Sequence, residues 1–180
     1  MKNLRNIWII VVALLLAPGC RAQLQRISLN STGSLINWSV EPVTEHSPSG
    51  NEISRPHYRS QQAIKAVVPG VVFTSYVEAG KVPDPDYADN IHRVDETFFN
   101  RPFWYRGTFK TPEGLKSGQK VWLQFDNTNR YADFYLNGVK ISGTPTSSRD
   151  VSGHMLRSKY EISGLLRPHG DNVVAGLITD

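Results

Sequence analysis

The twelve residues YADFYLNGVKIS, 131–142, constrain the fold more than any other stretch of the chain. Apolar side chains recur at every second position up to Leu136, which is the period of a β-strand with one buried face. Asn137 and Gly138 follow at once, and this pair favours the type I′ turn that joins two antiparallel strands. A second short strand then starts at Val139. The stretch therefore predicts a β-hairpin, and with it an antiparallel sheet.

Short apolar or alternating segments of the same kind recur along most of the chain. They are separated by the residues that turns prefer, Gly, Pro, Asn and Asp. One segment, 71–80, instead carries apolar residues at helical spacing and ends at Gly80, which suits the position after a helix end. The pattern predicts an all-β fold, an antiparallel β-sandwich of jelly-roll type with one short helix. Strands or extended segments are expected at 34–40, 61–70, 103–111, 119–127, 155–163 and 173–178, and loops at 42–59 and 147–154.

The first residues carry an export pattern. Lys2 and Arg5 precede an unbroken apolar run, Ile7–Leu16, which is too short to span a bilayer. The following LLLAPGC resembles a bacterial lipoprotein box, in which Cys20 would be lipidated and become the mature N-terminus. Cleavage before Gln23 without a lipid and an uncleaved anchor are the alternatives.

This pattern divides the chain into three parts. We expect a lipoprotein-type signal peptide over 1–19, a tether over 20–33 and one domain over 34–180. About 160 residues remain after the signal, which is enough for a single domain with a sizeable core. The expected location is the periplasm or the cell surface, with the membrane reached only through the lipid.

Composition narrows the classes of partner and cofactor. The net charge is +4 without any basic run, so nucleic acid is not expected as a partner. Cys20 is the only cysteine, which excludes an intramolecular disulfide and a zinc site built from cysteines. The histidines are scattered, and no H-E-x-x-H pattern, G-x-S-x-G elbow or Walker loop occurs. We expect neither a metal nor a cofactor.

The stretch VPDPDYADNIHRVDETFFNRPFWYRGTF, Val82–Phe109, is unusually dense in acidic and aromatic residues. Asp84 and Asp86 match the first and third positions of a calcium loop, but the glycine and the glutamate that such a loop needs later are Asp89 and Asp95. The alternative, which we favour, is that Asp84 and Asp86 organise turns by accepting backbone hydrogen bonds.

Asp89 and Asn90 suggest a different chemistry. A carboxylate beside a carboxamide can accept and donate hydrogen bonds together, which suits the vicinal hydroxyls of a sugar. In a dry pocket such bonds discriminate strongly, because a ligand without the hydroxyl leaves a polar group unpaired. We therefore take Asp89 and Asn90 as candidate sugar-binding residues.

Trp104 and Arg106 complete the candidate site. Trp104 can offer an apolar face to a sugar ring, and Arg106 can bind a carboxylate in a bidentate pair. In a strand these two residues share one face, and Phe103 and Tyr105 lie on the other. The alternative is that Trp104 and Arg106 pack and brace the sandwich.

Taken in order, several segments resemble the N-terminal sugar-binding domain of glycoside hydrolase family 2. The similar segments are VVPGVVFTSYVEAGKVPDPDYADN, WYRGTF, ADFYLNG and YEISGLLRPHGDNVVAGLI, which together cover about Val67–Ile178. The D-P-x-Y-x-D-N loop followed by W-Y-R is the specific part of the pattern. It is most similar to the exo-β-glucosaminidase and β-mannosidase branch of the family.

The resemblance implies a galactose-binding-like jelly roll as the fold. It also implies a retaining exo-β-glycosidase whose two catalytic glutamates lie about 5–5.5 Å apart on a TIM barrel, beyond an immunoglobulin-like domain. We expect the barrel to be absent here, and no glutamate of this chain lies in a context similar to the family's catalytic motifs, so no catalytic residue is assigned. In that branch the D-N pair reaches the terminal sugar at the mouth of the barrel, which implies this role for Asp89 and Asn90.

The favoured functional expectation is the N-terminal piece of a secreted or lipid-anchored exo-β-glycosidase, inactive alone. Its partners would be the non-reducing end of a β-linked mannoside or glucosaminide and the missing domains of the enzyme. A free-standing, lipid-anchored carbohydrate-binding module is the first alternative, and a sandwich without sugar affinity is the second. The long polar stretch Glu41–Arg59 and the segment His154–Arg157 depart from the family pattern and leave the sugar open.

Overall fold

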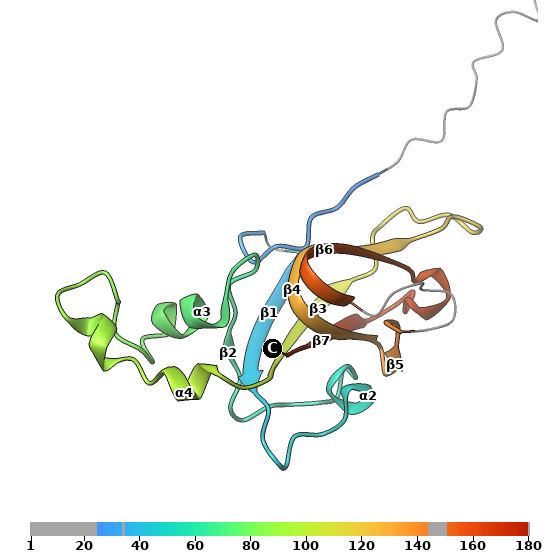
Figure 1. Cartoon of the computed structure of the whole chain (residues 1–180). Coiled ribbons are helices and arrows are strands. Elements are labelled where there is room, and N and C mark those ends of the chain that lie inside the picture. The colour runs from blue at the N-terminus through green and yellow to red at the C-terminus, as the bar shows by residue number, and fades with distance from the viewer. Residues whose placement is uncertain (1–24, 34, 144–150, 180) are drawn as a thin grey trace, which may run out of the picture.

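The computed structural model describes residues 25–33, 35–143 and 151–179 (Figure 1). The expected signal peptide and Cys20 lie outside these residues. The strands are β1 (Ile36–Pro42), β2 (Ile64–Lys65), β3 (Phe103–Lys110), β4 (Trp122–Leu136), β5 (Val139–Lys140), β6 (Val151–Glu161) and β7 (Asp171–Thr179). The helical segments are α2 (Gly50–Ile53), α3 (Val72–Glu78) and α4 (Glu96–Phe99), with 3-10 turns η1 (Asn90–Arg93) and η2 (Ser163–Leu165).

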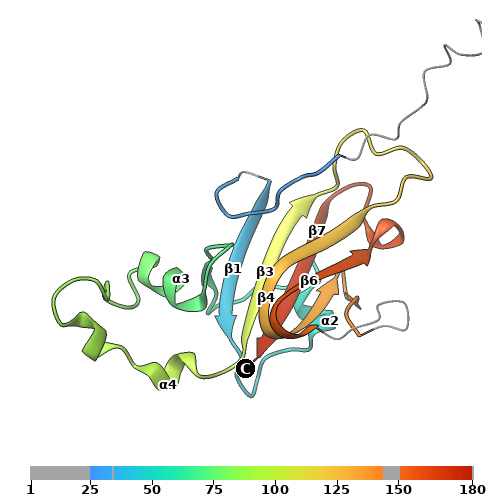
Figure 2. The same cartoon turned by 45° about the horizontal axis from the view of Figure 1, so that its top comes forward.

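The strands form an antiparallel sheet that curls into two layers. The order is β2-β1-β3-β7-β4-β5, with β6 paired to β4. β4 joins the layers, because its residues 122–132 pair with β6, with register shifts between Phe125 and Arg130, and its residues 131–136 pair with β7. Figure 2 shows the curl, with β4 and β6 lying over β3 and β7. The predicted all-β antiparallel fold is confirmed.

The main core lies between these layers. Ile36, Phe109 and Val174 contribute from β1, β3 and β7, and Leu123 and Tyr160 contribute from β4 and β6. On β4, Ala132, Phe134 and Leu136 lie in this core at alternate positions, as the sequence pattern predicts. Burial of this apolar surface is the main stabilising contribution of the fold.

The predicted hairpin and helix are both present. Asn137 and Gly138 have φ of 51° and 92°, the left-handed conformation that a type I′ turn needs, and β5 follows at Val139. α3 ends at Glu78, and Gly80 has φ of 64°, as expected for the residue after a helix end.

Several boundaries differ from the prediction. The segments expected as two strands around 119–136 form the single strand β4, and β6 begins at Val151, inside a predicted loop. Pairing with β4 extends β6, so a tertiary contact overrides a weak local preference. α2 and α4 were not predicted, because one helical turn is too short to show a period.

The expected tether, 20–33, is described only from residue 25 on. Its described part ends against the sheet, where the Trp38 indole N–H donates to Leu29 O at 2.7 Å and Ser31 N donates to Val68 O at 2.6 Å. Leu29 also packs on the main core. Among the described residues, no helix has the length and apolar character that crossing a membrane requires.

β3 separates two smaller apolar clusters, and this separation decides where the candidate site residues lie. Phe103 packs with Val40 and Tyr76 on one side. Trp104 packs with Ile53 and Ala175 on the other. The predicted alternation along β3 is therefore confirmed.

Candidate functional site

The candidate sugar-binding loop lies in an arm, residues 81–100, between α3 and β3. Both views show the arm standing away from the sheet, beyond α3, and returning through α4 (Figures 1 and 2). Its backbone forms short turns rather than strands, so side chains and single backbone bonds must fix its shape. The arm is thus an appendage of the sandwich rather than a part of its core.

Aromatic rings anchor the base of the arm. Tyr76 of α3 meets Phe98 and Phe99 of α4 edge-on, with ring centroids 5.1 and 5.5 Å apart. Phe98 also contacts Phe103 of β3 at 5.9 Å, and the Arg101 guanidinium lies 5.1 Å above the Phe98 ring. Edge-on ring pairs are favourable beyond the area they bury. Phe98, Phe99 and Phe103 therefore hold the arm on the sheet.

Hydrogen bonds to Asp84 shape the tip of the arm. The Asp84 carboxylate accepts from Asp86 N at 3.0 Å, and its backbone carbonyl accepts from the Asn90 side-chain amide at 2.9 Å. The turn-forming role predicted for Asp84 is confirmed, whereas Asp86 contributes its backbone N–H rather than its carboxylate. Between Asp86 and Asn90 the chain turns through Ala88, whose φ is 54°. This conformation is unfavourable for alanine, so the surrounding hydrogen bonds must hold it.

Asp89 and Asn90 retain unused hydrogen-bonding capacity. Asp89 Oδ1 pairs with Arg93 at 3.0 Å, and the side chain of Asp89 is 66% exposed. Among the described residues no hydrogen bond or ion pair is made to Asp89 Oδ2 or Asn90 Oδ1, and the Asn90 amide uses one of its two hydrogens. Two acceptors and one donor on adjacent residues match what vicinal hydroxyls require.

Sequence reasoning overlooked two residues of this arm. Tyr87 is 73% exposed, which makes it an available aromatic surface next to the Asp-Asn pair. Arg93 pairs with Asp89 and so restrains the position of its side chain. The signals were present, since Tyr87 lies inside the D-P-x-Y-x-D-N motif and Arg93 follows Asp89 at the spacing that ion pairs favour in helices.

Asp95 closes the arm by capping α4. Its carboxylate accepts from Thr97 N at 3.0 Å and from the Thr97 hydroxyl. The hydroxyl bond is the main cause that lowers the pKa of Asp95. Because this carboxylate already accepts the hydrogen bonds that cap α4, we do not take it as a ligand-binding group.

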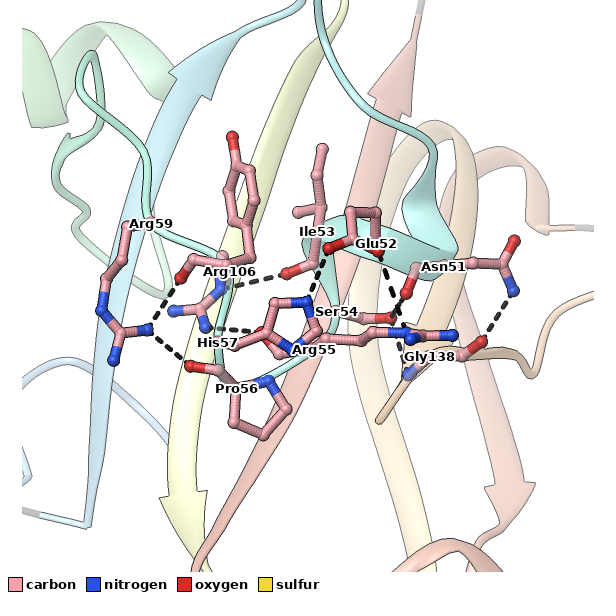
Figure 3. Close-up of polar contacts among 11 residues, drawn as sticks. Asn51, Glu52, Ile53, Ser54, Arg55, Pro56, His57, Arg59, Arg106 and Gly138 are labelled. Atoms are coloured by element: carbon pink, nitrogen blue, oxygen red, sulfur yellow. Dashed lines mark hydrogen bonds and ion pairs between the residues drawn. The ribbon is translucent and has the colours of Figure 1, made fainter.

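Trp104 and Arg106 lie on the opposite side of β3 from the aromatic base of the arm. Trp104 is only 4% exposed and meets Tyr135 edge-on at 5.8 Å. Arg106 is half-buried beneath the segment that follows α2, where Nε donates to Ile53 O at 3.1 Å and Nη2 donates to Arg55 O at 3.2 Å (Figure 3). Burial is the main cause that lowers the pKa of Arg106 below its ordinary value.

The four predicted residues therefore form two separate groups. Asp89 and Asn90 lie in the arm, and Trp104 and Arg106 lie beneath α2. The contacts of Trp104 and Arg106 support the alternative that these two brace the sandwich. Sugar contact by any of the four stays a prediction.

Two open clefts flank the sandwich. One, of about 390 Å³, lies against α4 and is lined by Glu96, Thr97, Phe99 and Asn100. The other, of about 750 Å³, lies between the 111–120 loop and η2. In the part of the chain that the structure describes, no three His, Cys, Asp or Glu side chains gather in a way that could hold a metal ion.

Comparison with known proteins assigns a family to this fold. Residues 44–175 match the family model of the glycosyl hydrolase 2 galactose-binding domain-like domain. The mannosylglycoprotein endo-β-mannosidase of Lilium longiflorum is 31% identical over 143 residues, which are 77% of this chain and 13% of that protein. The exo-β-D-glucosaminidase of Amycolatopsis orientalis is 24% identical over 123 residues, 68% of this chain and 11% of that protein.

Solved structures show the same fold. The crystal structure of the Amycolatopsis orientalis exo-chitosanase superposes with a TM-score of 0.66 at 22% identity, over 79% of this chain and 16% of that one. A β-D-mannosidase from Dictyoglomus thermophilum superposes with a TM-score of 0.59 at 20% identity, over 87% and 16%. The chain thus spans about an eighth of the length of the curated relatives it matches first.

Proposed function

Because the chain belongs to the galactose-binding domain-like family of glycosyl hydrolases 2, we propose that it is the N-terminal sugar-binding domain of a larger exo-β-glycosidase. Two of its relatives are named as enzymes that act on β-mannosides and β-glucosaminides. The proposed ligand is accordingly the non-reducing end of a β-linked mannoside or glucosaminide. The other domains of the same enzyme, an immunoglobulin-like one and a TIM barrel with the catalytic glutamates, are its proposed partners.

The geometry of the arm carries this proposal. Asp89 and Asn90 present unused acceptors at the end of an arm that stands clear of the sandwich, and Tyr87 offers an exposed ring beside them. An arm in this position suits one wall of a site whose other walls belong to another domain. The Asp84 and Arg93 contacts fix the pair before ligand arrives, which reduces the entropy lost on binding.

Sugar binding by the arm is testable on the chain alone. We would titrate the ¹⁵N-labelled chain with chitosan dimer and, separately, with β-1,4-mannobiose, and follow the backbone amides by NMR. The expected result is a set of shifts confined to the arm, at millimolar concentrations because one wall alone gives few contacts. Asp89→Ala should abolish these shifts, and Glu45→Ala, which removes an exposed carboxylate outside the arm, should leave them unchanged.

Two results would count against the arm as the site. Shifts centred on the cleft between the 111–120 loop and η2 would move the ligand elsewhere. Equal shifts in the wild type and in Asp89→Ala would show that the pair makes no contact with the sugar.

The link to a larger enzyme needs a separate test. The nucleotides that follow the Asp180 codon in the source genome should continue as an open frame with an immunoglobulin-like and a barrel-like pattern. A stop codon without barrel sequence in any nearby frame would favour the free-standing binding module instead. We expect the pure chain to hydrolyse neither aryl β-mannosides nor aryl β-glucosaminides, and turnover of either would refute this.

We also propose that the chain is exported and lipid-anchored through Cys20. The support is the basic start, the apolar run Ile7–Leu16 and the LLLAPGC sequence. Mass spectrometry of the protein purified from bacterial membranes should find a diacylated Cys20 as the first residue. A mature N-terminus at Gln23 would instead show plain secretion.

A further inference from the structure

The segment that follows α2 is fixed to the outer face of the sheet, on the side away from the arm's aromatic base. Ile53 is fully buried there, against Trp104 and Ala175. At its start, the Asn51 amide donates to Gly138 O at 2.7 Å, and Gly138 N donates to the Ser54 hydroxyl at 3.0 Å. Residues 50–60, which we call the α2 segment, therefore form a rigid ridge rather than a free loop (Figure 3).

Two arginines and a histidine line the outer edge of this ridge. Arg55, His57 and Arg59 are exposed at every second position of the α2 segment. The Glu52 carboxylate contacts two of them, with Oε1 2.7 Å from His57 Nε2 and Oε2 4.0 Å from Arg55 Nε. Arg59 has no carboxylate within ion-pair distance among the described residues.

The ridge itself holds the Arg59 guanidinium in place. Nη1 donates to the backbone carbonyls of Pro56 and Tyr58, which uses both of its hydrogens. Nε and Nη2 make no hydrogen bond to any described residue, and these two atoms form the edge of arginine that binds a carboxylate with two parallel bonds. A fixed guanidinium loses little freedom when it binds, which favours recognition.

Positive charge is left in excess at this point. The Arg106 guanidinium lies beside Arg59 in the close-up view, and repulsion from Arg59 is one of the causes that lower the pKa of Arg106. The acids that act on these two arginines already have partners. Glu41 accepts from Tyr58 and Ser60, and Asp171 pairs with Lys110 at 2.6 Å. Neither guanidinium has a carboxylate within ion-pair distance among the described residues, so an anion that reaches them would be stabilised.

The shape of the surface indicates what kind of anion fits. Arg59 is exposed, and no residue of the α2 segment lines either of the two clefts described above. Small ligands bind in concave pockets, whereas protein surfaces meet ridges and pair charges across them. We propose that the α2 segment is a docking ridge for an acidic surface of another protein domain, with a carboxylate bound by the free edge of Arg59. The proposal is independent of sugar binding by the arm.

The test uses a blocked octaglutamate peptide as a probe of that chemistry, with sodium acetate and trigalacturonate in separate titrations at equal carboxylate concentration. Shifts of the amides at 55–59 should appear with the peptide and weaken on raising the salt concentration. Arg59→Gln should weaken binding about fivefold, the range of a well-placed exposed ion pair. Arg59→Lys should lose most of the same affinity, because it keeps the charge but not the two-bond edge. Lys81→Gln, which removes one exposed charge from the arm, should leave the affinity unchanged.

Each other outcome overturns the proposal in a distinct way. Equal peptide affinity in Arg59→Gln and the wild type would show that Arg59 binds nothing. Acetate shifts as large as those of the peptide would show an adventitious ion only. Tighter binding of trigalacturonate than of the peptide would reassign the ridge to acidic sugars. Because the arm and the α2 segment report through different amides, failure here leaves the sugar-binding proposal unaffected.

Discussion

A buried asparagine offers the sharpest test of how this fold is held together. Asn172 is fully buried at the start of β7. Its Oδ1 accepts from the Asn137 side-chain amide at 2.9 Å and from Arg167 N at 2.8 Å, and its Nδ2 donates to the Thr111 hydroxyl at 2.8 Å. One side chain thus ties the hairpin turn, the turn before β7 and the end of β3 together.

Asn172→Ala should remove all three bonds. Each is worth about 1 kcal/mol net, so we expect a loss of about 3 kcal/mol in the free energy of unfolding. For a domain of this size that corresponds to a fall of about 6–12 °C in Tm. Urea unfolding followed by tryptophan fluorescence would measure it, and an unchanged m-value would show that the native state alone is affected.

Two further variants separate the network from side-chain loss in general. Asn100→Ala removes an exposed asparagine without a side-chain hydrogen bond to a described residue and should change the stability by less than about 0.5 kcal/mol. Thr111→Val combined with Asn172→Ala should cost less than the sum of the single changes, because the two variants delete one shared bond. A loss below about 1 kcal/mol for Asn172→Ala, or full additivity in the pair, would refute this account.

Two other predictions concern residues of β3. Arg106→Met keeps the apolar stem but removes the hydrogen bonds to the carbonyls of Ile53 and Arg55. It should lower the free energy of unfolding by about 1–2 kcal/mol and speed the amide hydrogen exchange of the α2 segment. Unchanged exchange in that segment would show that Arg106 does not hold it. Burial raises the pKa of Tyr105 to about 12, against about 10 in the unfolded chain. The contribution of its neutral hydroxyl to the free energy of unfolding is therefore complete below pH 10 and is lost as the pH rises from about 10 to about 12. Urea unfolding at pH 9 and pH 11.5 measures how much free energy of unfolding each protein loses between these two pH values. The loss should be smaller by about 2 kcal/mol in Tyr105→Phe than in the wild type. Equal losses in both proteins would contradict the raised pKa.

Local patterns predicted the strands well because the information is local. The alternation up to Leu136 and the Asn137-Gly138 turn depend on neighbours in sequence, and both have the expected conformation. The same holds for Gly80 at the end of α3. The missed start of β6 at Val151 has the opposite cause, since that segment is extended only through pairing with β4.

The candidate site was predicted only in part. Asp89 and Asn90 are adjacent in sequence, so their proximity needs no tertiary structure. Trp104 and Arg106 lie fewer than twenty residues further on, yet the chain returns through α4 and directs both to the other side of β3. Distance along the chain does not tell which face of a strand a loop will lie over.

By itself, the sequence determined the all-β class, the hairpin, the family resemblance and the acidic motif of the arm, because each depends on residue type and short spacing. The tertiary structure decided which of these residues remain available to a ligand. Trp104 is buried and Arg106 is bound to backbone carbonyls, whereas Tyr87 and Arg59 keep unpaired surface. Availability depends on what packs above a side chain, and that is set by contacts between segments far apart in the sequence.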